Sequence, residues 1–213
     1  EEVIRFGLTE KFEVRAVINT NTEGYENPAI FINPNRVRGI EPLTVGFKYN
    51  LAQEHGWVPQ TTWLSHVSLP WIAVGDYRAV FQSNTVFHEQ RLMMEKSITD
   101  RFGLATNIGV AGGLSGSTGF IDQGMFSLAA GYDLGNDFGI YIEYFADWQL
   151  VANQFTAVPY IDGGFTKLLN NDLQLDIYGG LDISSYTGAT APSTGFFIGT
   201  GVSYRLPVAH YFR

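Results

Sequence analysis

The chain reads FGLTEKFEVR over residues 6–15, and this stretch decides the fold. One alternating run ends in a short polar turn, and a second alternating run starts at Phe12. Related phrases return as SITDRFGL at 97–104, DLGNDFGI at 133–140 and KLLNNDLQL at 167–175. Turns of Asn, Asp, Gly and Thr between alternating segments are hairpin signals. The repetition predicts an antiparallel, up-and-down β protein.

The segments between these turns have an unusual length. They run for about nine to thirteen residues, longer than the usual strand of a soluble protein, and this length fits a tilted strand that crosses a bilayer. No stretch approaches the roughly eighteen to twenty apolar residues of a membrane helix. A closed barrel is the other backbone that satisfies its hydrogen bonds in lipid. We therefore expect an all-β fold, an antiparallel up-and-down transmembrane β-barrel, with a large soluble β-sandwich as the alternative.

The composition agrees with a membrane barrel. Charged residues make up only 16% of the 213 residues, below the quarter that is typical of soluble domains, as expected where one strand face meets lipid. The absence of Cys excludes a disulfide framework and thiolate chemistry. The net charge of −8 argues against nucleic acid as a partner. Because no linker or shift in composition interrupts the chain, we expect one domain over residues 1–213.

Side chains in a strand alternate between its two faces, and the sequence alternates accordingly. Segment 173–184 places leucine and isoleucine on one face and mostly polar side chains on the other, and the pattern recurs in 12–19, 43–50, 138–149 and 195–206. In a barrel the apolar face meets lipid and the polar face meets the lumen. Candidates for the aromatic belts at the two membrane interfaces are Trp57, Trp71, Tyr144 and Trp148.

We expect about eleven strands in all. They lie near 1–8, 12–22, 43–53, 58–70, 83–98, 103–115, 119–134, 138–151, 157–169, 173–185 and 195–206. Outer-membrane barrels have short periplasmic turns, longer external loops and an even number of strands. Since eleven is odd, we expect a barrel of about twelve strands in the bacterial outer membrane, with an N-terminal strand missing from this sequence. For the longest connection, 23–42, several interpretations are open: an ordinary surface loop, an inward constriction, a cap over the mouth of the barrel or a contact with a partner.

The predicted lumen face carries many charged side chains. They form either a permeation path whose charge selects solutes or an ion-pair network that fills a narrow barrel. The acids Asp162, Asp176 and Asp182 indicate an interior that favours cations. The candidate lumen-lining residues are Glu13, Arg15, Lys48, His66, Glu89, Arg91, Glu95, Glu143, Asp147, Asp162, Asp176, Asp182 and Arg205.

No motif for catalysis or for a cofactor stands out. His66 and Ser68 share a strand face, but a serine hydrolase also needs an orienting acid and a nucleophile motif. The four histidines show no metal-ligand spacing. The Gly-rich stretch 112–119 lacks the Gly-Lys-Ser/Thr ending of a phosphate loop. We expect no catalytic residue, no metal and no cofactor.

Several phrases together resemble one family. Besides residues 6–15, they are VGFKYNL at 45–51, LSHVSLP at 64–70, DGGFT at 162–166, NDLQLD at 171–176 and GVSYRLP at 201–207. Over nearly its whole length the chain resembles the outer-membrane transporter family labelled "putative MetA-pathway of phenol degradation", in its Bacteroidetes-like form.

The resemblance implies a porin-like transporter in a Gram-negative outer membrane. It would carry small solutes, with aromatic or hydrophobic molecules among them, and it would contact outer-membrane lipid and lipopolysaccharide. The alternative is an occluded structural or accessory barrel that belongs to a membrane-protein complex. These two functions differ in whether a folded barrel conducts.

Overall fold

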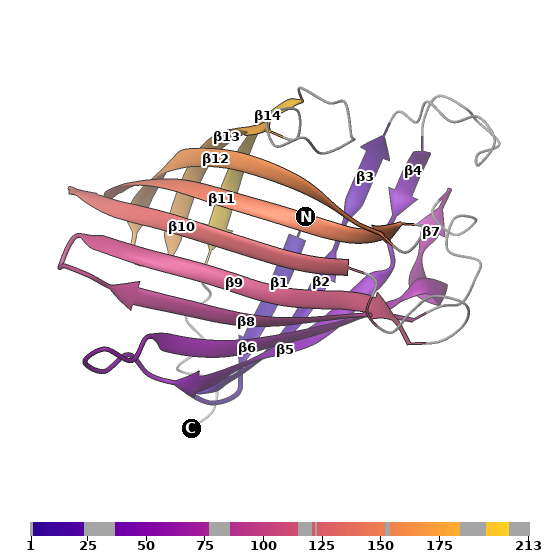
Figure 1. Cartoon of the computed structure of the whole chain (residues 1–213), viewed down its shortest axis with the longest axis horizontal. Coiled ribbons are helices and arrows are strands. Elements are labelled where there is room, and N and C mark those ends of the chain that lie inside the picture. Colours follow the sequence, from indigo (N-terminus) through magenta and orange to yellow (C-terminus); the bar gives the residue numbers. More distant parts are fainter. Residues whose placement is uncertain are drawn as a thin grey trace. The chain divides into compact units, whose positions relative to one another are not determined.

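The computed structural model describes residues 2–23, 37–76, 86–114, 121, 123–151, 154–183 and 195–204. Within them, eleven strands form one antiparallel sheet in which each strand pairs with the next strand of that sheet along the chain (Figure 1). These strands are β1 (Glu2–Gly7), β2 (Phe12–Ile18), β5 (Leu43–Ala52), β6 (Gln60–Leu69), β8 (Phe87–Ser97), β9 (Phe102–Gly113), β10 (Gln123–Gly135), β11 (Phe138–Val151), β12 (Gln154–Asn170), β13 (Leu173–Asp182) and β14 (Phe196–Tyr204). The all-β, up-and-down prediction is confirmed, and each expected segment overlaps one of these strands, although β9, β10 and β12 extend beyond the expected bounds.

The recurrent turn phrase folds in the same way at its first two occurrences. Thr9 Oγ1 accepts hydrogen bonds from the backbone N–H groups of Lys11 at 3.2 Å and Phe12 at 3.0 Å. Thr99 Oγ1 accepts the two equivalent bonds in its own turn, at 3.3 and 3.0 Å. The threonine hydroxyl thus satisfies backbone donors that the turn would leave without a partner, which explains why the phrase repeats.

The next two turns use Asn and Asp instead. Asn136 and Asp137 have φ of 53° and 63°, in the left-handed region that a tight two-residue hairpin requires. Asp133 Oδ1 accepts a hydrogen bond from the backbone N–H two residues on, at 2.7 Å, and Asn170 Oδ1 does the same at 2.8 Å. Short side-chain acceptors therefore fix these hairpins locally.

A second, three-stranded sheet was not expected from the sequence. It has the order β3-β4-β7 and consists of β3 (Thr20–Glu23), β4 (Val37–Ile40) and β7 (Val74–Gly75), while a short 3-10 turn, η1 (Pro70–Ile72), precedes β7. The expected single strand 12–22 breaks at Asn19, whose Nδ2 donates to Glu41 Oε2 at 3.0 Å. The two ends of the expected loop 23–42 thus pair as a hairpin, while its middle, 24–36, lies outside the described residues.

The chain divides into two compact units, and each is described by itself. Unit 1 comprises residues 1–53, 60–93 and 109–124, and unit 2 comprises residues 54–59, 94–108 and 125–213. Three of the boundaries fall inside β8, β9 and β10, and the other two fall at the ends of the turn 54–59 between β5 and β6. The single domain over 1–213 stays a prediction.

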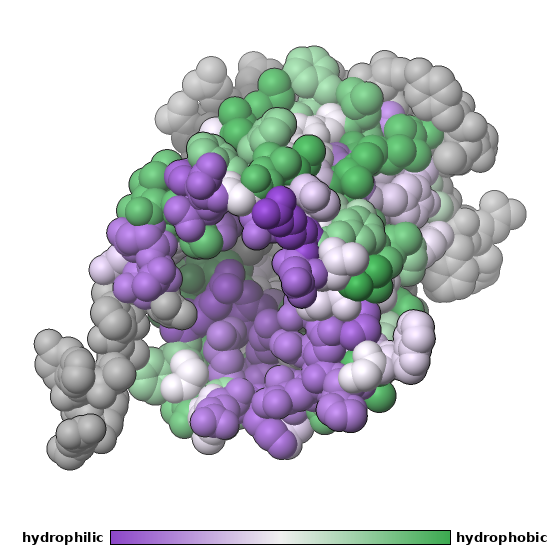
Figure 2. All heavy atoms as spheres, turned by 90° about the vertical axis from the view of Figure 1, so that its left-hand side faces the viewer, coloured by the Kyte–Doolittle hydropathy of each residue, from purple (hydrophilic) through white to green (hydrophobic). Residues whose placement is uncertain are grey.

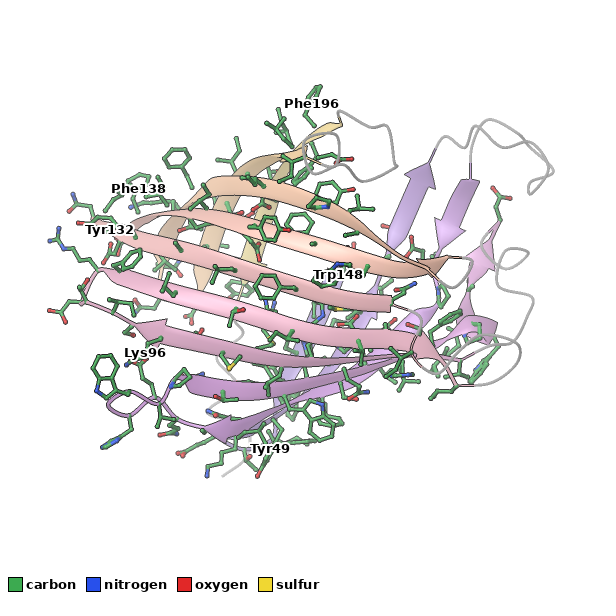
Figure 3. The ribbon with its side chains drawn as sticks, in the orientation of Figure 1. Tyr49, Lys96, Tyr132, Phe138, Trp148 and Phe196 are labelled. Carbon is green, nitrogen blue, oxygen red and sulfur yellow. The ribbon has the colours of Figure 1, made fainter. Side chains whose placement is uncertain are left out.

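In unit 2, hydrophobic side chains project from one face of the sheet into the open. On β13, Leu181 is 58% exposed and Ile177 53%, and on β14, Phe196 is 75% exposed. Phe138 and Phe196 point away from the ribbon (Figure 3). The polar residues between them in sequence are covered, and Asp182 is only 5% exposed. We call these two sides the apolar face and the polar face.

Unit 1 has the same two faces. Ile4, Val45 and Trp63 are exposed on its apolar face, while Arg15 and His66 are largely covered on its polar face. Figure 2 shows green areas, where hydrophobic side chains lie open, beside purple areas where hydrophilic side chains gather. The buried hydrophobic residues of the described part are Val17, Leu64, Ala73 and Ala146. This is the reverse of the burial pattern of soluble domains.

The described residues include no helix of the length and apolarity needed to cross a membrane.

Candidate functional site

The strand register of unit 2 brings acidic residues together on the polar face. Glu143 of β11 lies opposite Asp162 of β12. On the next strand, Asp182 lies opposite Tyr160, which is two residues from Asp162 along β12. The register therefore confirms that Asp162 and Asp182 share one face and one sector of unit 2.

Asp176 lies on the same face but further along the strands. It is opposite Thr166, and the row between it and Asp162 consists of Tyr141, Gly164 and Tyr178. A Cβ atom placed on Gly164 would come within 2.9 Å of the Tyr141 ring and of Tyr178 Cβ, closer than ordinary van der Waals contact. Glycine at this position therefore makes room for two phenol rings on the polar face.

The basic residues of unit 2 lie elsewhere. Lys167 sits on the apolar face, where its Nζ lies 4.2 Å from the centroid of the Phe138 ring and 3.7 Å from Asp137 Oδ2. Arg101 is in a turn, and Lys96 is held by an acid of the turn 53–59. In the described parts of β11, β12, β13 and β14, no Lys or Arg occupies a polar-face position. The polar-face acids of unit 2 are Glu95, by the alternation of β8, and Glu143, Asp147, Asp162, Asp176 and Asp182.

The polar face of unit 1 is different, because its acids and bases are interleaved. Arg15 Nε lies 3.5 Å from Glu13 Oε1. Glu89 forms an ion pair with Arg91 and lies 3.9 Å from His66 Nδ1. These side chains are partly covered, so their charges compensate one another rather than creating a field of one sign.

Glycine again makes room between large side chains in unit 1. Arg15, Gly46 and His66 lie in one row across β2, β5 and β6. A Cβ atom on Gly46 would collide with the His66 ring. In the adjacent row Lys48 lies opposite Glu13. The polar face of unit 1 therefore has the character of an ion-pair network, which is one of the two interpretations given above for the predicted lumen face.

A pocket of about 420 Å³ lies on unit 2 beside the ends of the short turns. Four small residues from alternate positions of two strands leave the space for it. Tyr141 contributes a phenol to the lining, and Glu95 contributes a carboxylate. The lining includes Glu95 of β8, Gly103 and Ala105 of β9, Ala129 and Gly131 of β10, and Tyr141 of β11.

Glu54 holds the turn 53–59 against the end of β8. Its Oε1 accepts a hydrogen bond from Lys96 Nζ at 2.5 Å, and its Oε2 accepts bonds from the backbone N–H and the hydroxyl of Ser97, each at 3.1 Å. The bond from Lys96 is the main reason why the pKa of Glu54 lies below its usual value, followed by the bond from the Ser97 backbone. At the tip of the same turn Trp57 is 98% exposed. Lys96 lies at the short-turn end (Figure 3), where its charge is compensated by Glu54.

The described candidate residues are divided between the two units. Those in unit 1 are Glu13, Arg15, Lys48, His66, Glu89 and Arg91, and those in unit 2 are the six acids given above. Arg205 lies outside the described residues. Within the described ranges, no group of three or more His, Cys, Asp or Glu residues could hold a metal ion. Their role as lumen lining stays a prediction.

Sequence reasoning missed the residues that shape the pocket. Tyr141 and Tyr178 fall on the polar side of the alternation in segments 138–149 and 173–184, but nothing in the sequence marks them as neighbours across Gly164. The signal in the sequence is the alternation of small residues at 103 and 105 and again at 129 and 131. These small residues predict an unfilled space on one face of each of the two strands. Only the structure shows that the two spaces adjoin and form one pocket.

The comparisons with known proteins identify one family. No curated protein is similar enough to match the chain. One family has a sequence model that matches residues 3–206, which reach from β1 to beyond the end of β14. The chain therefore belongs to the family described as "Putative MetA-pathway of phenol degradation".

Proposed function

We propose that this chain is a β-barrel of a Gram-negative outer membrane and that it lets small solutes pass. The observation that carries the proposal is the two-faced sheet, whose apolar face is open while most of the side chains on its polar face are partly or fully covered. Strands such as β5 and β13, with 10 residues each, and β11, with 14, are long enough to cross a bilayer when tilted. Exposed isoleucine, leucine and phenylalanine along such strands are favourable in lipid and unfavourable in water.

In this proposal the sheet closes and its polar face lines the interior. Unpaired strand edges are not tolerated in hydrocarbon, so both β1 and β14 must find partners there. The apolar face then contacts outer-membrane lipid and lipopolysaccharide. The family description supports a role connected with small aromatic molecules only in a general way, and the proposal names no catalytic residue.

A second candidate is an occluded barrel that acts as an accessory subunit of a membrane complex. The ion-paired polar face of unit 1 favours it, because the pairs around Glu89 and Arg15 fill space that solutes would need. This candidate predicts a folded barrel that does not conduct.

Conductance separates the two functions. The chain is refolded in detergent, checked for β structure by circular dichroism and added to a planar bilayer, with heat-denatured chain as the control. The channel proposal expects discrete current steps from the folded sample alone. A folded sample without current steps would reject the channel and leave the accessory subunit.

A further inference from the structure

We propose that the pocket on unit 2 binds a small organic cation, an ammonium group on a compact hydrocarbon body. The inference rests on the proposed function and deepens it, because it names the class of solute that would bind on the polar face. It is carried by the shape and lining of the pocket together with the distribution of charge around it.

The charge around the pocket is negative. Glu95 lines the pocket directly. Tyr141, which also lines it, lies between the row that pairs Glu143 with Asp162 and the row that holds Asp176. Lys96 is the one cation that the lining includes, and Glu54 already accepts a hydrogen bond from it and forms an ion pair with it. A cationic guest would thus meet carboxylates, while an anion would be repelled by them.

The rest of the lining suits hydrocarbon. Ala105 and Ala129 present methyl groups, and Gly103 and Gly131 present no side chain at all. The Tyr141 ring adds an aromatic surface, and ammonium groups bind to the faces of such rings. At about 420 Å³ the volume lies at the lower end of the roughly 300–1,000 Å³ that small-molecule sites occupy. The pocket therefore has room for a small guest with both an apolar body and a positive charge.

Three probes of the same size test the class of ligand. Benzylammonium, benzyl alcohol and benzoate share one ring and differ in charge. Binding to the refolded chain in detergent is measured by isothermal titration calorimetry at neutral pH. We expect benzylammonium to bind about tenfold more tightly than benzyl alcohol, the change that one charged contact gives, and benzoate to bind most weakly.

Variants locate the binding in the pocket. Glu95→Gln removes the carboxylate, and Ala129→Leu fills the space, so each should weaken benzylammonium by about tenfold. Tyr141→Phe keeps the ring and should retain binding, whereas Tyr141→Leu should lose it. Asp100→Asn removes an acid from an exposed turn outside the pocket and should leave the affinity unchanged. If Ala129→Leu fails to fold by circular dichroism, Ala105→Val fills the same pocket from the neighbouring strand.

Two results would overturn the inference. One is equal or tighter binding of benzyl alcohol or benzoate, and the other is full affinity for benzylammonium in a folded variant with the filled pocket. The conductance assay is independent of both. A barrel that binds benzylammonium without conducting keeps the site and rejects the channel, whereas one that conducts without selective binding rejects the site alone.

Discussion

Glu143 of β11 and Asp162 of β12 lie directly opposite each other, so two carboxylates meet on the polar face of unit 2. Asp162 Oδ1 is one of several buried side-chain atoms that have no hydrogen-bond partner among the described residues. Like charges directly opposite each other destabilise a sheet. The pair thus lowers the stability of the fold while it supplies the negative potential that a path for cations needs.

The first prediction concerns this pair. Glu143→Gln keeps the size of the side chain and removes the repulsion, so it should raise the free energy of unfolding by about 0.2–1 kcal/mol. Urea titrations of the barrel in lipid vesicles measure the change. Asp100→Asn, in an exposed turn, is the control and should have little effect. A clear loss of stability in Glu143→Gln would mean that the pair shares a proton or a hydrogen bond rather than repelling.

The second prediction concerns the apolar face. Ile177 is 53% exposed near the middle of β13, and Ile177→Arg should lower the free energy of unfolding from vesicles by about 2–4 kcal/mol if the side chain faces the bilayer midplane. Gln174→Arg, on the polar face of the same strand, should be tolerated better. Equal losses of stability in the two variants would contradict the assignment of the two faces of β13.

The third prediction concerns the turn threonines. Thr99→Ala removes the acceptor of two backbone N–H groups and should lower the free energy of unfolding by about 0.5–1.5 kcal/mol for each bond lost. Thr99→Ser retains the hydroxyl and should restore most of the stability, as measured in the same urea titrations. If Ser and Ala were equally destabilising, the hydroxyl would have no part in the turn.

The fourth prediction concerns pH. The pKa of Glu54 is lower in the folded chain than its ordinary value of 4.5, so its contact with Lys96 stabilises the fold above that value and is lost as the pH falls through the lower, folded pKa. Glu54→Gln should therefore be less stable than wild type at neutral pH and equally stable at about pH 2. Unfolding of the two proteins is followed by fluorescence across this range. A gap between them that stays constant with pH would show that the ion pair contributes nothing.

The sequence predicted most of the sheet because the information is local. A phrase such as residues 6–15 contains its own turn acceptor, Thr9, and the alternation on both sides fixes the faces. The prediction failed at β3 and β4, since these segments of four residues each, TNTE and VRGI, are too short to show an alternation. They pair across the ends of the loop after the break at Asn19. Their pairing depends on contacts across a long loop that no local pattern records.

The candidate site was predictable in part. The alternation of β8 and of β11 to β13 predicted the six acids on one face, but the sequence does not state which rows of neighbouring strands adjoin. The relation of Tyr141 to Tyr178 across Gly164 depends on that register. The positive charge of Lys96 is compensated by Glu54, a turn residue that lies far from Lys96 in the sequence. Such features become visible only when strands are paired.

The central claim is that the polar face lines a conducting path, and reversal potentials across a salt gradient test it most directly. In a planar bilayer the wild-type barrel should prefer cations, because the polar-face positions in the described parts of β11, β12 and β13 hold acids and no Lys or Arg. The triple variant of Asp162→Asn, Asp176→Asn and Asp182→Asn should move the reversal potential toward zero. A folded wild-type barrel that carries no current, or one whose reversal potential favours anions, would contradict the claim.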